Sequence, residues 1–181
     1  LSTTVYGDFK FKGRLKAIRH TIRPSISYGY RPDFANKYNQ QVQQSIDPTD
    51  ILTYSPFENG IYGRSNTAEA GVINMSLMNN FELKVRNRKD SLGEDKKIKL
   101  LESLRFSSSY NTTADSLNWS NIQINARTNI FKRITLNYNG SVDPYALDSN
   151  TSTSAITKVN EFELNRNGRI GRLVSSSLAV G

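Results

Sequence analysis

The sequence predicts an all-β fold of long antiparallel strands, as in a segment of a transmembrane β-barrel. Helical periodicity is nearly absent, whereas polar and apolar residues alternate over runs of about ten residues or more. The connections between these runs are alternately short and long. Apolar residues never run longer than three in a row, which excludes a membrane-spanning helix of about twenty apolar residues. A membrane β-barrel is not excluded, because its strands need only alternate between polar and apolar residues.

The alternating runs define eight expected strands. They cover residues 1–10, 18–31, 71–86, 98–110, 117–130, 134–143, 157–166 and 170–181. In the sixth run, Ile134, Leu136 and Tyr138 alternate with polar residues. The phase slips in the fourth run at residues 101–102 and in the fifth at residues 119–122, and we expect a β-bulge at each place.

Connection lengths indicate two different ends of the sheet. A very long connection of about residues 32–70 follows the second run, and polar connections also follow the fourth and sixth, whereas most turns after the odd-numbered runs are tight. Successive antiparallel strands end at alternate ends of a sheet, so the long connections should lie together. Outer-membrane barrels have extracellular loops and short periplasmic turns, and we therefore expect residues 32–70 to form an extracellular loop.

A soluble β-sandwich would alternate too, but three features favour the barrel. The strands are longer than the usual five or six residues, and the polar phase is rich in arginine. Aromatic residues gather near strand ends, as in an interfacial girdle. They are Tyr28, Tyr30, Phe106, Tyr110 and Trp119 toward the long connections, and Phe9, Phe81 and Phe131 toward the tight turns.

Six basic residues fall on the polar phase and are candidates for facing a lumen. They are Arg19, Arg23, Arg31, Lys84, Arg105 and Arg127. A closed eight-stranded barrel is packed with side chains, and burying unpaired cations there costs several kcal/mol per ion. Asp8 and Glu82 are too few to pair them all, which favours the water-filled lumen of a larger barrel. The cations either contact a phosphate-bearing ligand or simply keep the lumen hydrated.

Pro24 lies on the apolar phase near the middle of the second run. In a barrel it would lie near the bilayer centre, where a carbonyl without a donor finds no water. Such a proline belongs at a bulge, an edge or a seam. Pro24 therefore marks either a locally bulged, permanently closed strand or a place where the ladder is weakened so that it can open.

No residue pattern indicates catalysis, a metal or a cofactor. The chain has no cysteine and one histidine, His20, so neither a metal ligand set nor a catalytic triad can be assembled. Nucleotide-binding and zinc-protease motifs are absent. The net charge of +8 suits an acidic partner or a solvated basic face. Because the chain starts without Met and both ends read as strand, we expect residues 1–181 to be one internal region of a longer barrel protein.

Several segments together resemble the LptD family of lipopolysaccharide-assembly proteins, in the form found in Bacteroidetes. In chain order they are AIRHTIRPSISYGYRPDF, YSPFENGIYG, LMNNFELKVRNRKD, KKIKLLESLRFSSSYNTTADSLNWS, DPYAL and GRIGRL. The resemblance implies an outer-membrane barrel of a Gram-negative bacterium that receives lipopolysaccharide from a periplasmic Lpt bridge and releases it among the outer-membrane lipids. It also implies an LptE-like plug lipoprotein, no nucleic-acid partner, and Pro24 as a candidate for weakening its strand near a lateral seam.

Two other functions fit the residue pattern. An outer-membrane solute or polypeptide channel of another family would use similar strands, and a plug domain or a solute-binding lipoprotein partner would distinguish it. A soluble basic β-domain could bind nucleic acid through tyrosine and phenylalanine interleaved with arginine. Such a domain would be soluble without detergent, and its binding would weaken with salt.

Overall fold

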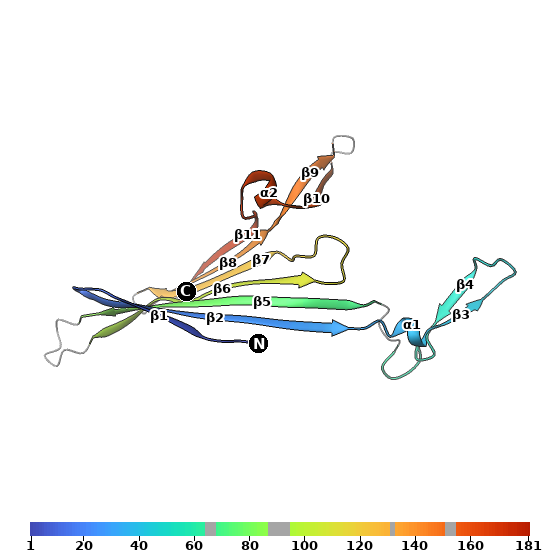
Figure 1. The fold of residues 1–181 in the computed structure, drawn as a ribbon, viewed down its shortest axis with the longest axis horizontal. Helices are drawn as coiled ribbons and strands as arrows, with labels where there is room; N and C mark the ends of the chain where they lie inside the picture. Colours follow the sequence, from blue (N-terminus) through green and yellow to red (C-terminus); the bar gives the residue numbers. More distant parts are fainter. Residues whose placement is uncertain (64–67, 87–94, 131–132, 151–154) are drawn as a thin grey trace. The chain divides into compact units, whose positions relative to one another are not determined.

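Strands dominate the computed structural model, which describes residues 1–63, 68–86, 95–130, 133–150 and 155–181. The main sheet has seven strands, and its order follows the chain (Figure 1). They are β1 (Val5–Lys10), β2 (Leu15–Arg31), β5 (Ala70–Val85), β6 (Lys96–Asn111), β7 (Ile122–Ile130), β8 (Ile134–Asp143) and β11 (Arg172–Val180). The predicted all-β antiparallel class is confirmed. In the described part of the chain the sheet is open, with β1 and β11 as its edges.

The chain divides into two units, residues 1–27 with 73–181 and residues 28–72. The second unit holds the predicted long loop, which contains helix α1 (Ala35–Tyr38) and a hairpin of β3 (Gln40–Gln43) and β4 (Ile51–Tyr54). In the hairpin turn, Asp47 Oδ1 accepts hydrogen bonds from the backbone N–H of Thr49 at 2.9 Å and from its hydroxyl at 2.7 Å. These bonds hold the pKa of Asp47 below its ordinary value.

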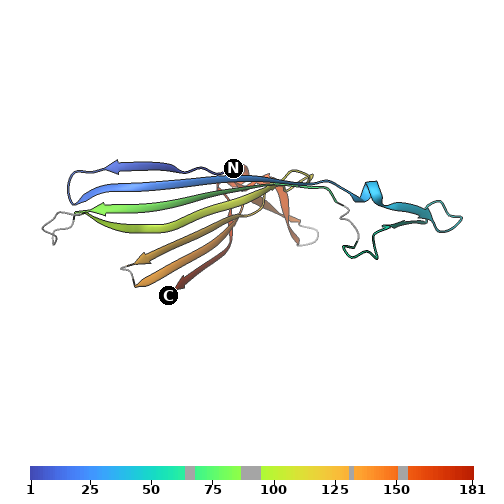
Figure 2. The ribbon, with the colours of Figure 1, turned by 90° about the horizontal axis from the view of Figure 1, so that it is seen from below.

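The predicted separation of tight turns and long connections holds only in part, because residues 86–95 after β5 are as many as residues 112–121 after β6. Residues 11–14 join β1 to β2, and this turn lies at the end of the sheet where β7 ends and β8 starts (Figure 2). Residues 112–121 follow β6 and residues 144–171 follow β8, and both leave from the opposite end because the strands alternate in direction.

The strand expected at residues 157–166 does not join the main sheet, so that part of the prediction is wrong. Residues Ala155–Phe162 form β10, which pairs with β9 (Tyr145–Asn150), and helix α2 (Glu163–Asn167) follows. The rings of Tyr145 and Phe162 stack at 5.4 Å, and Glu163 N–H donates to the carbonyl of Pro144 at 2.8 Å. Because these residues find partners locally, β11 takes the place beside β8.

The carboxylate of Asp143 anchors this connection. Asp143 is fully buried and accepts a hydrogen bond from the backbone N–H of Tyr145 at 3.1 Å. One of its oxygens, Oδ2, lies 2.6 Å from Lys158 Nζ and 3.2 Å from Arg172 Nη2. A single side chain therefore ties the end of β8 to β10 and to the start of β11.

Buried apolar side chains are almost missing from the described part of the chain, where Tyr145 and Ala146 are the buried hydrophobic residues. Large apolar side chains of the main sheet stay exposed, among them Leu77 at 39%, Leu178 at 65% and Val180 at 67%. Within the described residues of this unit, many of the large apolar side chains of the main sheet are not covered by a second layer.

Replacing Asp143 with asparagine should loosen the connection between β8 and β11. The amide keeps the volume but removes the charge that holds Lys158 and Arg172. Both cations are partly exposed, so we expect the free energy of local opening to fall by about 1–3 kcal/mol. Hydrogen exchange of the full-length protein, read at residues 144–150, measures this change.

Asp148→Asn is the matched control, because that carboxylate is 56% exposed and lies 3.5 Å from Arg166. An exposed pair of this kind contributes at most about 1 kcal/mol, so the control should change exchange much less. Equal effects of the two variants would show that the buried carboxylate is not the anchor.

Candidate functional site

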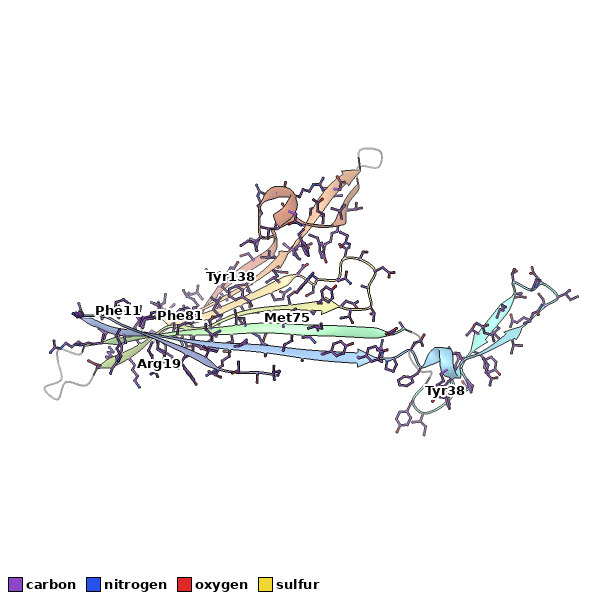
Figure 3. All side chains as sticks on the ribbon, viewed as in Figure 1. Phe11, Arg19, Tyr38, Met75, Phe81 and Tyr138 are labelled. Atoms are coloured by element: carbon purple, nitrogen blue, oxygen red, sulfur yellow. The ribbon has the colours of Figure 1, made fainter. Side chains whose placement is uncertain are left out.

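Cross-strand register divides the main sheet into two chemically different faces. Between β7 and β8, polar residues oppose one another in the pairs Gln123–Ser141, Asn125–Asn139 and Arg127–Asn137. Apolar or small residues oppose one another in the pairs Ile122–Val142, Ile124–Gly140 and Ala126–Tyr138. We call these the polar face and the apolar face of the main sheet. Figure 3 shows the same division on neighbouring strands, with Arg19 and Phe81 on opposite sides.

Five of the six predicted lumen-facing cations lie in the unit that holds the main sheet, and three of these five are ion-paired. The pairs are Arg19–Asp8 at 2.9 Å, Lys84–Asp95 at 3.2 Å and Arg127–Glu102 at 3.5 Å. The cationic side chains are 49–57% exposed, so water reaches them and each pair contributes at most about 1 kcal/mol. Sequence reasoning counted too few carboxylates: Asp95 lies in a connection and Glu102 at a phase slip.

The other two cations of this unit have no carboxylate partner in the described part of the chain. Arg105 Nη2 lies 3.4 Å from Ser76 Oγ, which is 2.7 Å from Ser25 Oγ. Arg23 lines a polar cavity of about 310 Å³ beside Arg19. Both guanidinium groups are therefore available to an anionic group that approaches the polar face.

Arg31 belongs to the second unit, where its Nη2 lies 3.4 Å from the carbonyl oxygen of Ala68. The structure gives it a partner within that unit. Its assignment to a lumen remains a proposal.

The phase slip predicted at residues 119–122 has a structural counterpart. Tyr110 bridges to Trp119, whereas Ser107 pairs with Gln123, so the later strand holds one more residue than the earlier one between these pairs. This confirms the predicted bulge before Ile122. Residues 101 and 102 both line the polar cavity, and the bulge predicted there stays a prediction. Phe131, the third aromatic predicted near the tight turns, lies outside the described residues.

Pro24 removes a hydrogen bond between β2 and the residues that precede β1. Thr3 N–H donates to the carbonyl of Pro24 at 3.3 Å, and two residues further on Leu1 and Ile26 bond in both directions at 2.8 and 2.9 Å. Proline has no N–H to return, so the carbonyl of Thr3 receives no hydrogen bond from β2. The strand that loses the bond is therefore the one on the N-terminal side, not β5.

No bulge accompanies this proline on that side of β2. Ser2 opposes Ser25 and Val5 opposes Ile22, so both strands advance by three residues across Pro24. The expectation of a bulge is wrong for this pair, because the ladder simply omits one bond and keeps its register. That Pro24 weakens the ladder so that it can open stays a prediction.

His20 lies on the apolar face, as its phase predicts. Its ring stacks on Phe81 with centroids 4.1 Å apart, and its Nε2 lies 2.9 Å from Oδ1 of buried Asn79. Asn79 also donates to the carbonyl of Leu104 at 3.4 Å. These contacts join β2, β5 and β6. No group of three potential metal-ligating residues is present among the described residues.

These features define the class of the chain: an all-β protein with a hydrated, charged sheet face and an uncovered apolar one. A family model described as LptD protein matches residues 1–145, and the chain belongs to that family. LptD proteins are outer-membrane proteins of lipopolysaccharide transport, not enzymes. Searches of curated proteins and of solved structures found no significant match. In the described part of the chain, no helix has the length and apolar content to cross a membrane.

Replacing Pro24 with alanine restores the missing N–H opposite Thr3. One added backbone hydrogen bond contributes about 0.5–1.5 kcal/mol, so exchange of the Thr3 amide should slow by about 2–10-fold. Hydrogen exchange of the full-length protein measures this, with Ser25→Ala as the control that leaves the backbone ladder unchanged. Slower exchange in β5 with no change at Thr3 would contradict the assignment.

Proposed function

We propose that this chain forms part of a transmembrane β-barrel in the outer membrane of a Gram-negative bacterium, and that the barrel inserts lipopolysaccharide into the outer leaflet. The uncovered apolar face of the main sheet, in a chain of the LptD family, carries this proposal. A strand that crosses a bilayer needs about 9–11 tilted residues. β7 has 9 residues and β8 has 10, and the longer strands would extend beyond the hydrocarbon.

The apolar face would contact lipid acyl chains. Its exposed side chains lie on several strands and include Phe9, Ile26, Leu77, Ile134 and Leu178. Each square ångström of apolar surface removed from water contributes about 25 cal/mol, so a hydrocarbon environment stabilises this face. Aqueous solution would leave these side chains as exposed apolar surface, which in soluble proteins marks an interaction site or an aggregation liability where it is extensive.

The polar face would line a water-filled lumen. The cations of its ion pairs are about half exposed, and drying these pairs would cost several kcal/mol per ion. A lumen wide enough to hold water requires more strands than the seven seen here. The long connections would then be extracellular and the tight turns periplasmic.

Transport of this kind makes and breaks no covalent bond. The charged sugar headgroup would follow the hydrated polar face while the acyl chains stay in the hydrocarbon phase. Arg23 and Arg105, which lack carboxylate partners in the described part of the chain, are placed to bind phosphate groups on the passing headgroup. We propose that a periplasmic Lpt bridge delivers lipopolysaccharide to the barrel and that an LptE-like lipoprotein plugs its lumen. We also propose that the protein is of the type found in Bacteroidetes.

Depletion of the full-length protein in cells should lower lipopolysaccharide at the cell surface while synthesis continues. Labelling intact cells with a lipopolysaccharide-specific antibody measures the surface pool, and extraction of whole cells measures the total. A complemented strain is the control. Normal surface lipopolysaccharide after complete depletion would refute the proposed function.

Adjacent residues of β7 test the membrane orientation. Ile124→Arg places a charge on the apolar face, which costs about 2–4 kcal/mol near the bilayer midplane, whereas Asn125→Arg places it on the polar face. We expect Ile124→Arg to lower the fraction of folded protein in the outer membrane strongly and Asn125→Arg to leave it near wild type. Folding is read from the heat-dependent mobility of the full-length protein. The reverse order would contradict the orientation.

A further inference from the structure

A cavity of about 770 Å³ opens on the apolar face of the main sheet. Apolar side chains of four neighbouring strands line it, namely Ile26, Met75, Leu77, Phe106 and Ile122. Figure 3 labels Met75, which lies along β5. The volume falls within the range of about 300–1,000 Å³ that small-molecule sites occupy.

The connection after β8 supplies another part of this lining. Pro144 and Phe162 both face the cavity, and the stacking of Phe162 on Tyr145 holds β10 against β9. The buried carboxylate of Asp143 fixes the start of this hairpin. One side of the cavity is therefore formed by a connection that Asp143 and the Tyr145–Phe162 stack hold in place, and the cavity is more than an exposed stretch of sheet.

A backbone acceptor belongs to a residue of this lining. Thr3 and Pro24 both line the cavity, and the carbonyl of Thr3 receives no hydrogen bond from Pro24. In a hydrocarbon environment an unpaired carbonyl costs several kcal/mol. A bound molecule that brings an N–H or O–H donor next to an apolar chain would satisfy both the acceptor and the lining.

We infer that this cavity binds an acyl chain of the transported lipid, with an amide N–H or a hydroxyl near the head of that chain donating to the Thr3 carbonyl. The inference rests on the proposed function, because it takes the apolar face to be in the membrane. Acyl chains joined by amides or carrying hydroxyls provide this donor. Ester-linked chains of glycerophospholipids do not, so the site favours lipopolysaccharide over the surrounding lipid.

Photocrosslinking in cells tests the site on the full-length protein. A benzophenone amino acid replaces Met75 in the cavity, or Leu83 on the same strand and face but outside it, or Gln123 on the polar face. Adducts are identified with antibody to lipopolysaccharide and by mass spectrometry of attached phospholipid. Leu77 is the second cavity position if the Met75 variant does not assemble.

We expect the Met75 position to give several times more lipopolysaccharide adduct than Leu83. Adding Pro24→Ala, which occupies the Thr3 carbonyl, should lower the Met75 adduct by about 2–10-fold, the effect of one hydrogen bond. The Gln123 adduct should persist in that variant.

Equal adducts at Met75 and Leu83, or adducts of Met75 with phospholipid or protein alone, would overturn the acyl-chain site. If Gln123 still crosslinks to lipopolysaccharide in that case, the proposed function stands without the site. Failure of all three positions to give a lipopolysaccharide adduct in assembled protein would overturn the proposed function as well.

Discussion

A single layer of β-sheet has no interior, so its stability depends on what covers its apolar face. Here the alternation of side chains sorts apolar residues onto one face and ionic or amide residues onto the other, as the opposed pairs of β7 and β8 show. Hydrophobic burial is the dominant favourable term in folding, yet only Tyr145 and Ala146 are buried hydrophobic residues in the described part of the chain. The covering layer must therefore come from outside these residues.

If a hydrocarbon phase covers the apolar face, the polar face must still be in contact with water. Three of its cations, Arg19, Lys84 and Arg127, keep about half of their surface in solvent and pair with carboxylates over 2.9–3.5 Å, a geometry suited to water and costly in a dry interior. The apolar face is therefore most stable in contact with lipid, and the polar face in contact with water. A wide membrane barrel provides both, and it would also require pairing for β1 and β11, whose outer backbone groups cannot stay unpaired in lipid.

The alternation of polar and apolar residues predicted the two faces and most of the strands, because a period of two can be recognised from consecutive residues of the sequence. Residues 134–143 were expected as a strand and form β8 with the same bounds. Pattern could not tell which strand pairs with which: residues 157–166 alternate well enough, but contacts around Asp143 and Tyr145 turn them into a local hairpin. The phase slip at Glu102 hid an ion-pair partner for Arg127. The sequence alone also could not tell on which side of β2 the hydrogen bond at Pro24 is missing, because that depends on the strand register in the structure.

Accessibility of spin labels along β8 tests the central claim most directly. The full-length protein would be reconstituted in lipid bilayers, with single labels at each residue from Thr135 to Val142. We predict that dissolved oxygen, which concentrates in hydrocarbon, reaches the even-numbered positions best, and that a water-soluble nickel complex reaches the odd-numbered ones best. High accessibility of both sets to the nickel complex, or the absence of a two-residue period, would contradict a sheet with lipid on one face and water on the other.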